Sequence, residues 1–176
     1  MLTRVHVMGS YWSDDADRRS ALGALVADAK DLESEAALDE LRRRLVDFVG
    51  ALALGENPVV VPVPPGPHRD AHPVPALAEA VAGRLGVPLA PVVDRRHDTP
   101  RLRDTPIDRR LAVVEAAGYV VTGDVVGRSV VLVDDVILTG TTLRHLAELL
   151  VAAGAAEIIA VVVCRTRLAG PRRMDG

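Results

Sequence analysis

Hydrophobic positions along this chain follow two periods. Between Ser34 and Leu52, apolar residues return every three or four positions with Glu and Arg between them, which predicts an amphipathic helix with one buried stripe. Around residues 58–63, 130–133 and 157–164, short runs of β-branched residues end at turn signals, as buried strands do. The opening stretch LTRVHV alternates like a further strand. Strands and helices mixed in this way predict an α/β protein.

The order of these elements predicts a mostly parallel central sheet flanked by helices. The run NPVVVPVPP, a helix over Ala76–Leu85 and the run VPLAPVV read as strand, helix and strand. The run VVLV, a helix over Thr141–Ala153 and a strand over Glu157–Cys164 form a second such unit. Caps and acidic residues in SDDAD predict another helix over Asp15–Lys30.

Length and composition fit one domain over residues 1–176. Apolar residues make up 49% of the 176 positions and aromatic residues only 2%, so Val, Leu, Ile and Ala must build the core. Residues 1–33 carry no motif, and we expect them to form a small N-terminal hood. Residues 94–110 lack apolar periodicity and carry many charges, which predicts a long flexible loop over a site or a solvated linker.

Charge and cysteine content exclude several classes of function. A net charge of −3 argues against general nucleic-acid binding, which needs a basic face. Cys164 is the only cysteine, which excludes a disulfide framework and a cysteine-based zinc site. No apolar run reaches the length of a membrane span. We therefore expect a soluble, cytoplasmic protein with no membrane partner.

The stretch VVLVDDVILTGTT carries the candidate chemistry. Asp134 and Asp135 follow a hydrophobic strand, and ligands bind at that edge of parallel α/β sheets. The TGTT segment, residues 139–142, opens a helix whose free N–H groups and dipole attract an anion. An anion pocket beside two carboxylates fits a ribose 5-phosphate, with the acids accepting hydrogen bonds from its hydroxyls. The alternative is that the acids only end a strand and a threonine only caps a helix.

This arrangement resembles the signature of type I phosphoribosyltransferases. The resemblance implies that Asp134 and Asp135 are the catalytic acids, which contact the ribose and, indirectly through its hydroxyls or water, a Mg²⁺ cofactor. It also implies a single-domain phosphoribosyltransferase fold that binds 5-phosphoribosyl-1-diphosphate. The loop implied to hold the 5-phosphate consists of Leu138, Thr139, Gly140, Thr141 and Thr142.

Within that superfamily the chain is most similar to the ComF type, the competence-associated group. The shared features are a strand that ends in a proline loop followed by an arginine, a charged loop, and the terminal DDVxxTGxT. Two features depart from the group: Arg69-Asp70-Ala71-His72-Pro73 replaces the usual RGxNQ element, and the N-terminal cysteine ribbon is missing. The resemblance implies a diphosphate loop of Pro64, Pro65, Gly66 and Arg69, for which a rigid turn is the alternative. It implies a flexible loop whose candidate arginines are Arg95, Arg96, Arg101 and Arg103.

The resemblance implies transfer of the phosphoribosyl group to an unidentified nitrogenous acceptor with release of diphosphate. Leu138 stands where purine-using relatives carry an acidic residue, so standard purine salvage is not expected. The rival hypothesis is a catalytically silent module that senses phosphoribosyl diphosphate or nucleotides. Such a module would act through a protein partner in competence, DNA uptake or regulation. A homodimer is compatible with either hypothesis.

Overall fold

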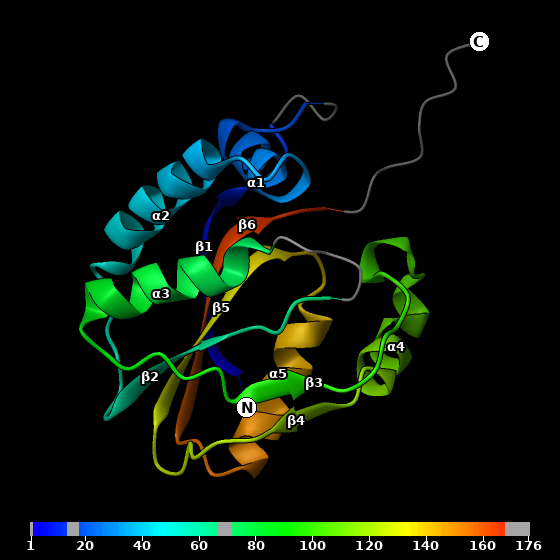
Figure 1. Cartoon of the computed structure of the whole chain (residues 1–176). Coiled ribbons are helices and arrows are strands. Elements are labelled where there is room, and N and C mark those ends of the chain that lie inside the picture. The colour runs from blue at the N-terminus through cyan, green and yellow to red at the C-terminus, as the bar shows by residue number, and fades with distance from the viewer. Residues whose placement is uncertain (1, 14–17, 67–71, 168–176) are drawn as a thin grey trace.

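A computed structural model describes residues 2–13, 18–66 and 72–167 of the chain. Its central sheet has four parallel strands in the order β1-β6-β5-β2 (Figure 1). The strands are β1 (Leu2–Ser10), β2 (Pro58–Pro62), β5 (Ser129–Ile137) and β6 (Glu157–Arg165). The predicted α/β fold with a parallel central sheet is therefore confirmed.

Helices cover both faces of this sheet (Figure 1). One face carries α1 (Ala21–Asp31), α2 (Glu35–Val49) and α3 (Pro73–Leu85), whose apolar stripes pack on Val131 and Val133. The other face carries α4 (Arg110–Ala116) and α5 (Thr141–Ala152), which pack on Val130 and Leu132. Successive residues of β5 thus enter opposite cores, as the two-residue period of a strand requires.

Two helices begin at other positions than the sequence predicts. α1 starts at Ala21 rather than Asp15, because the Ser20 side chain accepts the Gly23 N–H as its cap. Arg19, just before it, instead forms a bridge with Trp12. α3 starts at Pro73 rather than Ala76, since proline fits the first helical turn and the His72 side chain accepts the Val74 N–H.

The strand predicted in VPLAPVV is mostly absent. Leu89 makes one parallel bridge to Val60, and Pro88 and Pro91 have no N–H to continue a ladder. The chain instead forms β3 (Val93–Arg95), which pairs antiparallel with β4 (Tyr119–Val121). The loop predicted over 94–110 is therefore partly regular. It begins in β3 and continues through the short 3-10 helices η1 (Leu102–Asp104) and η2 (Ile107–Arg109).

The segment expected to form a hood divides into two parts. Residues 2–10 are an edge strand of the central sheet, since β1 pairs with β6 from Leu2↔Ile158 to Ser10↔Arg165. The other part consists of the described residues Tyr11–Ser13 and Arg18–Ser20 and of α1, which packs on the sheet. Among the described residues, no helix is both long and apolar enough to cross a membrane.

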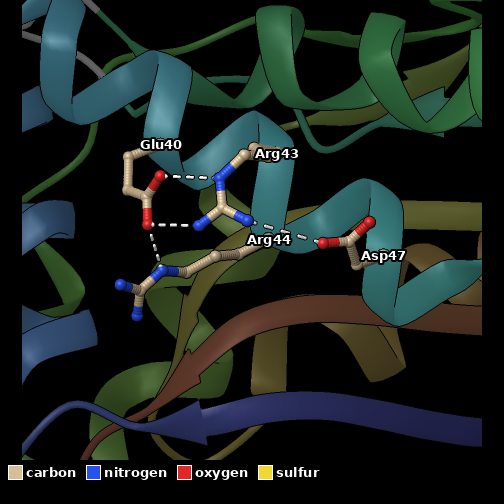
Figure 2. A network of polar contacts seen from close by, with 4 residues as sticks. All are labelled: Glu40, Arg43, Arg44 and Asp47. Atoms are coloured by element: carbon tan, nitrogen blue, oxygen red, sulfur yellow. Dashed lines mark hydrogen bonds and ion pairs between the residues drawn. The ribbon is translucent and has the colours of Figure 1, made fainter.

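The outer face of α2 carries a network of exposed ion pairs (Figure 2). Glu40 accepts hydrogen bonds from Arg43 and Arg44, and these bonds lower the pKa of its carboxyl to about 2. Arg43 also reaches Asp47, with 3.7 Å between Nη1 and Oδ2. None of the four residues lines the pocket described below, so this cluster is a solvated helix face.

Candidate functional site

A pocket of about 540 Å³ lies at the carboxyl ends of β2 and β5. Its lining comes from both ends of the chain and from the middle. The contributing parts are Tyr11, Trp12, Arg19 and α1, the loop that follows β2, His72 before α3, the end of β3 with the loop after it, α4, the start of β4, residues 134–143, and Thr166 with Arg167. The carboxyl edge of a parallel sheet is the expected ligand position. The two acids and the whole predicted phosphate loop lie in this one pocket.

The two acids lie within β5 rather than after it. The strand was predicted to end at Val133, but pairing with β6 continues to Ile137↔Arg165. Because side chains alternate along a strand, Asp134 and Asp135 face opposite sides of the sheet. Their environments therefore differ, although the sequence treats them as a matched pair.

Asp134 is partly exposed to the pocket, on the side of Tyr119. Its Oδ1 accepts the backbone N–H of Asp135 at 2.9 Å. Burial, with a further contribution from the neighbouring Asp135 charge, raises the pKa of the Asp134 carboxyl to about 7. Near neutral pH this acid can thus carry a proton or lose it.

Asp135 is 4% exposed and forms an ion pair with Lys30 of α1. Its Oδ2 receives no hydrogen bond among the described residues, so the ammonium is its compensation. The thiol of Cys164 is buried, and it also feels the charge of Asp135. Burial first, and the Asp135 charge second, raise the pKa of this thiol to about 12. Lys30 is the only lysine of the chain, and sequence reasoning gave it no role.

The phosphate loop has the backbone conformation that the motif predicts. Gly140 has φ of 74°, a left-handed value that favours glycine, and a Cβ there would lie 3.2 Å from Ile137 Cδ1. No side-chain cap accepts a hydrogen bond from the N–H groups in the first turn of α5. The Thr139 and Thr141 hydroxyls lie 2.9 Å apart, and Arg144 donates to the Thr139 carbonyl at 2.9 Å. The loop therefore offers N–H and O–H donors to an oxyanion.

The predicted diphosphate loop is described only in part. Pro64 and Gly66 line the pocket, Pro65 is exposed outside it, and Arg69 lies outside the described residues. A Cβ built on Gly66 would lie 3.9 Å from Nη1 of Arg95. The structure therefore brings Gly66 of the proline loop beside the arginine that ends β3.

The four candidate arginines of the flexible loop occupy different positions. Arg95 and Arg101 line the pocket, Arg96 is exposed outside it, and Arg103 belongs to η1. Arg95 is held in place: its guanidinium carbon lies 5.7 Å from the centre of the Tyr119 ring. It also donates to the Tyr119 hydroxyl at 3.3 Å and to Thr99 Oγ1 at 2.5 Å.

Arg110 is a pocket residue that sequence reasoning missed. It is 3% exposed, lines the pocket and donates from Nε to the Thr105 carbonyl at 3.0 Å. No ion pair among the described residues involves it. A buried guanidinium without a carboxylate is costly unless an anion compensates it. Its burial depends on tertiary packing, so no local sequence signal marks it.

Metal binding by the protein alone has little support. No group of three or more His, Cys, Asp or Glu side chains gathers among the described residues. Asp135 forms an ion pair with Lys30, whereas Asp134 forms none among the described residues. A divalent cation prefers oxygen ligands, so one carboxylate fits a Mg²⁺ that a phosphate ligand brings with it.

Comparison with known proteins identifies the family. A profile described as "Phosphoribosyl transferase domain" matches residues 32–175. Among curated proteins, the chain is 37% identical over 127 residues to the ribose-phosphate pyrophosphokinase of Streptomyces coelicolor, covering 72% of this chain and 33% of that protein. The corresponding protein of Bradyrhizobium diazoefficiens is 34% identical over 87 residues, covering 49% of this chain and 23% of that protein. The chain thus spans a third or less of the length of these curated relatives.

Solved structures with similar folds include two that are 26% identical to this chain. The glutamine phosphoribosylpyrophosphate amidotransferase from B. subtilis has a TM-score of 0.48, covering 69% of this chain and 26% of that chain. The orotate phosphoribosyltransferase from Aeropyrum pernix has a TM-score of 0.47, covering 76% of this chain and 62% of that chain. With the family profile matched over most of its length, the chain belongs to the phosphoribosyl transferase domain family.

Proposed function

We propose that this chain binds 5-phosphoribosyl-1-diphosphate with Mg²⁺ and transfers its phosphoribosyl group to a nitrogenous acceptor. One observation carries the proposal: a carboxylate of β5, a helix N-terminus without a side-chain cap and three arginines that form no ion pair among the described residues share a single pocket. These groups match the hydroxyls, the 5-phosphate and the diphosphate of one ligand. The pocket volume of about 540 Å³ is within the range of small-molecule sites.

Each part of the pocket has a role in this proposal. The N–H groups and hydroxyls of residues 138–142 hold the 5-phosphate, and Asp134 accepts hydrogen bonds from the ribose hydroxyls. Arg95, Arg101 and Arg110 neutralise the diphosphate, because guanidinium groups bind phosphoryl oxygens in a bidentate way. Bound Mg²⁺ would supply further neutralisation of the leaving diphosphate. The loop after β3 excludes water from the reacting carbon.

The reaction is a substitution at C1 of the ribose. The lone pair of an acceptor nitrogen forms the new bond to C1, while the C1–O bond breaks and diphosphate leaves with that electron pair. Leu138, which lines the pocket beside the phosphate loop, offers no group that could take a proton from a purine nitrogen. An acceptor other than a standard purine therefore fits the proposal better.

Finer assignments belong to the same proposal. The proline loop, the arginine-rich loop and the DDVxxTGxT motif support the ComF type within the family. A cytoplasmic location and a homodimer are proposed with it.

Calorimetry with phosphoribosyl diphosphate and Mg²⁺ tests the binding. An assay for released diphosphate with a panel of nitrogenous acceptors tests the transfer. Saturable binding with turnover supports the proposal. Binding without turnover on any acceptor would favour the silent sensing module, and absence of binding would refute both.

A further inference from the structure

We infer that Tyr119 is a positioning residue of the diphosphate site, whose ring and hydroxyl hold the Arg95 guanidinium beside the proline loop. The inference rests on the proposed function, because the assignment of Arg95 to the diphosphate comes from it. Sequence reasoning gave Tyr119 no role in the site.

The pairing of β3 with β4 places Tyr119 beside Arg95. The two residues lie directly opposite each other in the antiparallel register, so their side chains share one face of the two-stranded sheet. Val93 lies on the same face and is buried in the core, whereas Asp94 alternates to the other face and is exposed. Arg95 and Tyr119 both line the pocket. The face that they share is therefore the one turned toward the ligand.

The guanidinium of Arg95 is held by three residues. Its carbon lies 5.7 Å from the centre of the Tyr119 ring, and Nη1 donates to the Tyr119 hydroxyl at 3.3 Å. Nε donates to the His97 carbonyl at 3.1 Å, and Nη2 donates to Thr99 Oγ1 at 2.5 Å. His97 and Thr99 belong to the same loop as Arg95 and move with it. Tyr119 is 7% exposed and belongs to the core, so it is the support that fixes the guanidinium to the body of the domain.

This arrangement leaves the charge of Arg95 available to an anion. Arg95 forms no ion pair among the described residues. Burial raises the pKa of the Tyr119 hydroxyl, so it stays protonated at neutral pH and accepts the hydrogen bond as a neutral group. Each guanidinium nitrogen uses one N–H in these contacts, which leaves one N–H on each terminal nitrogen. Two such groups can bind two oxygens of one phosphoryl group.

The held guanidinium lies next to the proline loop. A Cβ built on Gly66 would lie 3.9 Å from Nη1 of Arg95, the nitrogen that donates to Tyr119. Arg101 also lines the pocket, but its side chain makes no hydrogen bond or ion pair among the described residues. Arg95 is thus the arginine of this loop that is ordered before the ligand arrives. Fixing one flexible side chain in advance improves affinity about two- to tenfold.

Tyr119→Phe tests the inference, because it removes the hydroxyl and keeps the ring that fills the core. Calorimetry with inorganic diphosphate and Mg²⁺ should show binding at least about threefold weaker than in the parent, from the loss of one hydrogen bond to a charged group. Binding of ribose 5-phosphate, which the phosphate loop holds, should not change. Thr122→Val is the matched control: it removes an exposed hydroxyl just after β4, outside the pocket lining, and should alter neither affinity.

A double-variant cycle with Arg95→Gln separates positioning from direct contact with the ligand. Arg95→Gln alone should weaken diphosphate binding more than Tyr119→Phe does, because it removes the charge. In the Arg95→Gln protein, Tyr119→Phe should have no further effect, since the side chain that it positions is gone. Thermal unfolding followed by circular dichroism establishes that each variant is folded at the temperature of the titration.

Three results would overturn the inference. Tyr119→Phe could bind diphosphate as tightly as the parent, so that the hydroxyl contributes nothing. It could lose diphosphate and ribose 5-phosphate binding equally, so that the tyrosine supports the pocket as a whole. It could keep its full effect in the Arg95→Gln protein, so that the hydroxyl contacts the ligand itself.

The parent protein separates this inference from the proposed function. If the parent binds neither diphosphate nor phosphoribosyl diphosphate, the proposed function fails and this inference falls with it. If the parent binds both and Tyr119→Phe gives any of the three results above, only the role of Tyr119 is refuted.

Discussion

Lys30→Met should destabilise the protein strongly, because it removes the ion-pair partner of a buried carboxylate. The side chains of Lys30 and Asp135 are 15% and 6% exposed, and Asp135 Oδ2 has no hydrogen-bond donor among the described residues. Breaking a buried ion pair by removing one partner costs about 3–5 kcal/mol. For a domain of this size, that corresponds to a fall in Tm of roughly 6–20 °C.

Thermal and urea unfolding followed by circular dichroism at pH 7 measure this effect. The double variant Lys30→Met with Asp135→Asn should recover much of the loss, since no buried charge then remains. Arg43→Met is the matched control: it removes a cation from the exposed network of Figure 2, and its unfolding midpoint should barely move.

Two results would refute this reasoning. A Lys30→Met protein as stable as the parent would mean that the ion pair contributes nothing to folding. A double variant no more stable than Lys30→Met would mean that the loss arises from packing of the lysine stem rather than from the Asp135 charge.

Three further predictions concern the pocket. Gly140→Val should abolish binding of ribose 5-phosphate in calorimetry, and it should lower stability because a β-branched residue at φ of 74° is strained. Unchanged affinity would refute the assignment of residues 138–142 as the phosphate loop. The pKa of Asp134 is raised to about 7, so the folded state keeps this proton to a higher pH than the unfolded state, and the free energy of unfolding should fall from about pH 4 to pH 7. Asp134→Asn should flatten that pH profile and weaken binding of phosphoribosyl diphosphate. An unchanged profile would contradict the raised pKa of Asp134. Arg110→Gln should weaken binding of inorganic diphosphate at least about tenfold, whereas substitution of the exposed neighbour, Arg109→Gln, should not; equal affinities would count against Arg110 as a diphosphate ligand. Hydrogen exchange over residues 94–110 should slow when diphosphate binds. A segment already protected in the free protein would count against its closing over the ligand.

Much of the fold could be predicted from local patterns. The helix over Glu35–Val49 and the strands at β2, β5 and β6 follow from periodicity, since each buries a contiguous stripe or run. The start of α1 was wrong because SDDAD and Ser20 both offer caps, and sequence alone does not rank them. The strand in VPLAPVV was wrong because its prolines outweigh its β-branched residues.

The candidate site was predictable only as far as its motif. The DDxxxTGTT stretch identifies the strand end and the phosphate loop from contiguous residues. Lys30, Arg110 and Trp12 reach the pocket from distant segments, and none has a local signature. The difference between Asp134 and Asp135 also arises from tertiary structure, because Lys30 of a separate helix approaches one face of β5 and not the other.

The pairing of β1 with β6 has a consequence for how the molecule folds. These strands are the first and the last along the described chain, and their contacts close the largest loop in the sheet. Contacts of such long range form late in folding, because loop closure precedes any gain from them. Trp12 and Thr166 line the pocket just beyond the ends of these two strands, so this side of the pocket takes shape only after the rest of the sheet. Substitutions that weaken the β1–β6 ladder should therefore disturb this side of the pocket while the phosphate loop still functions.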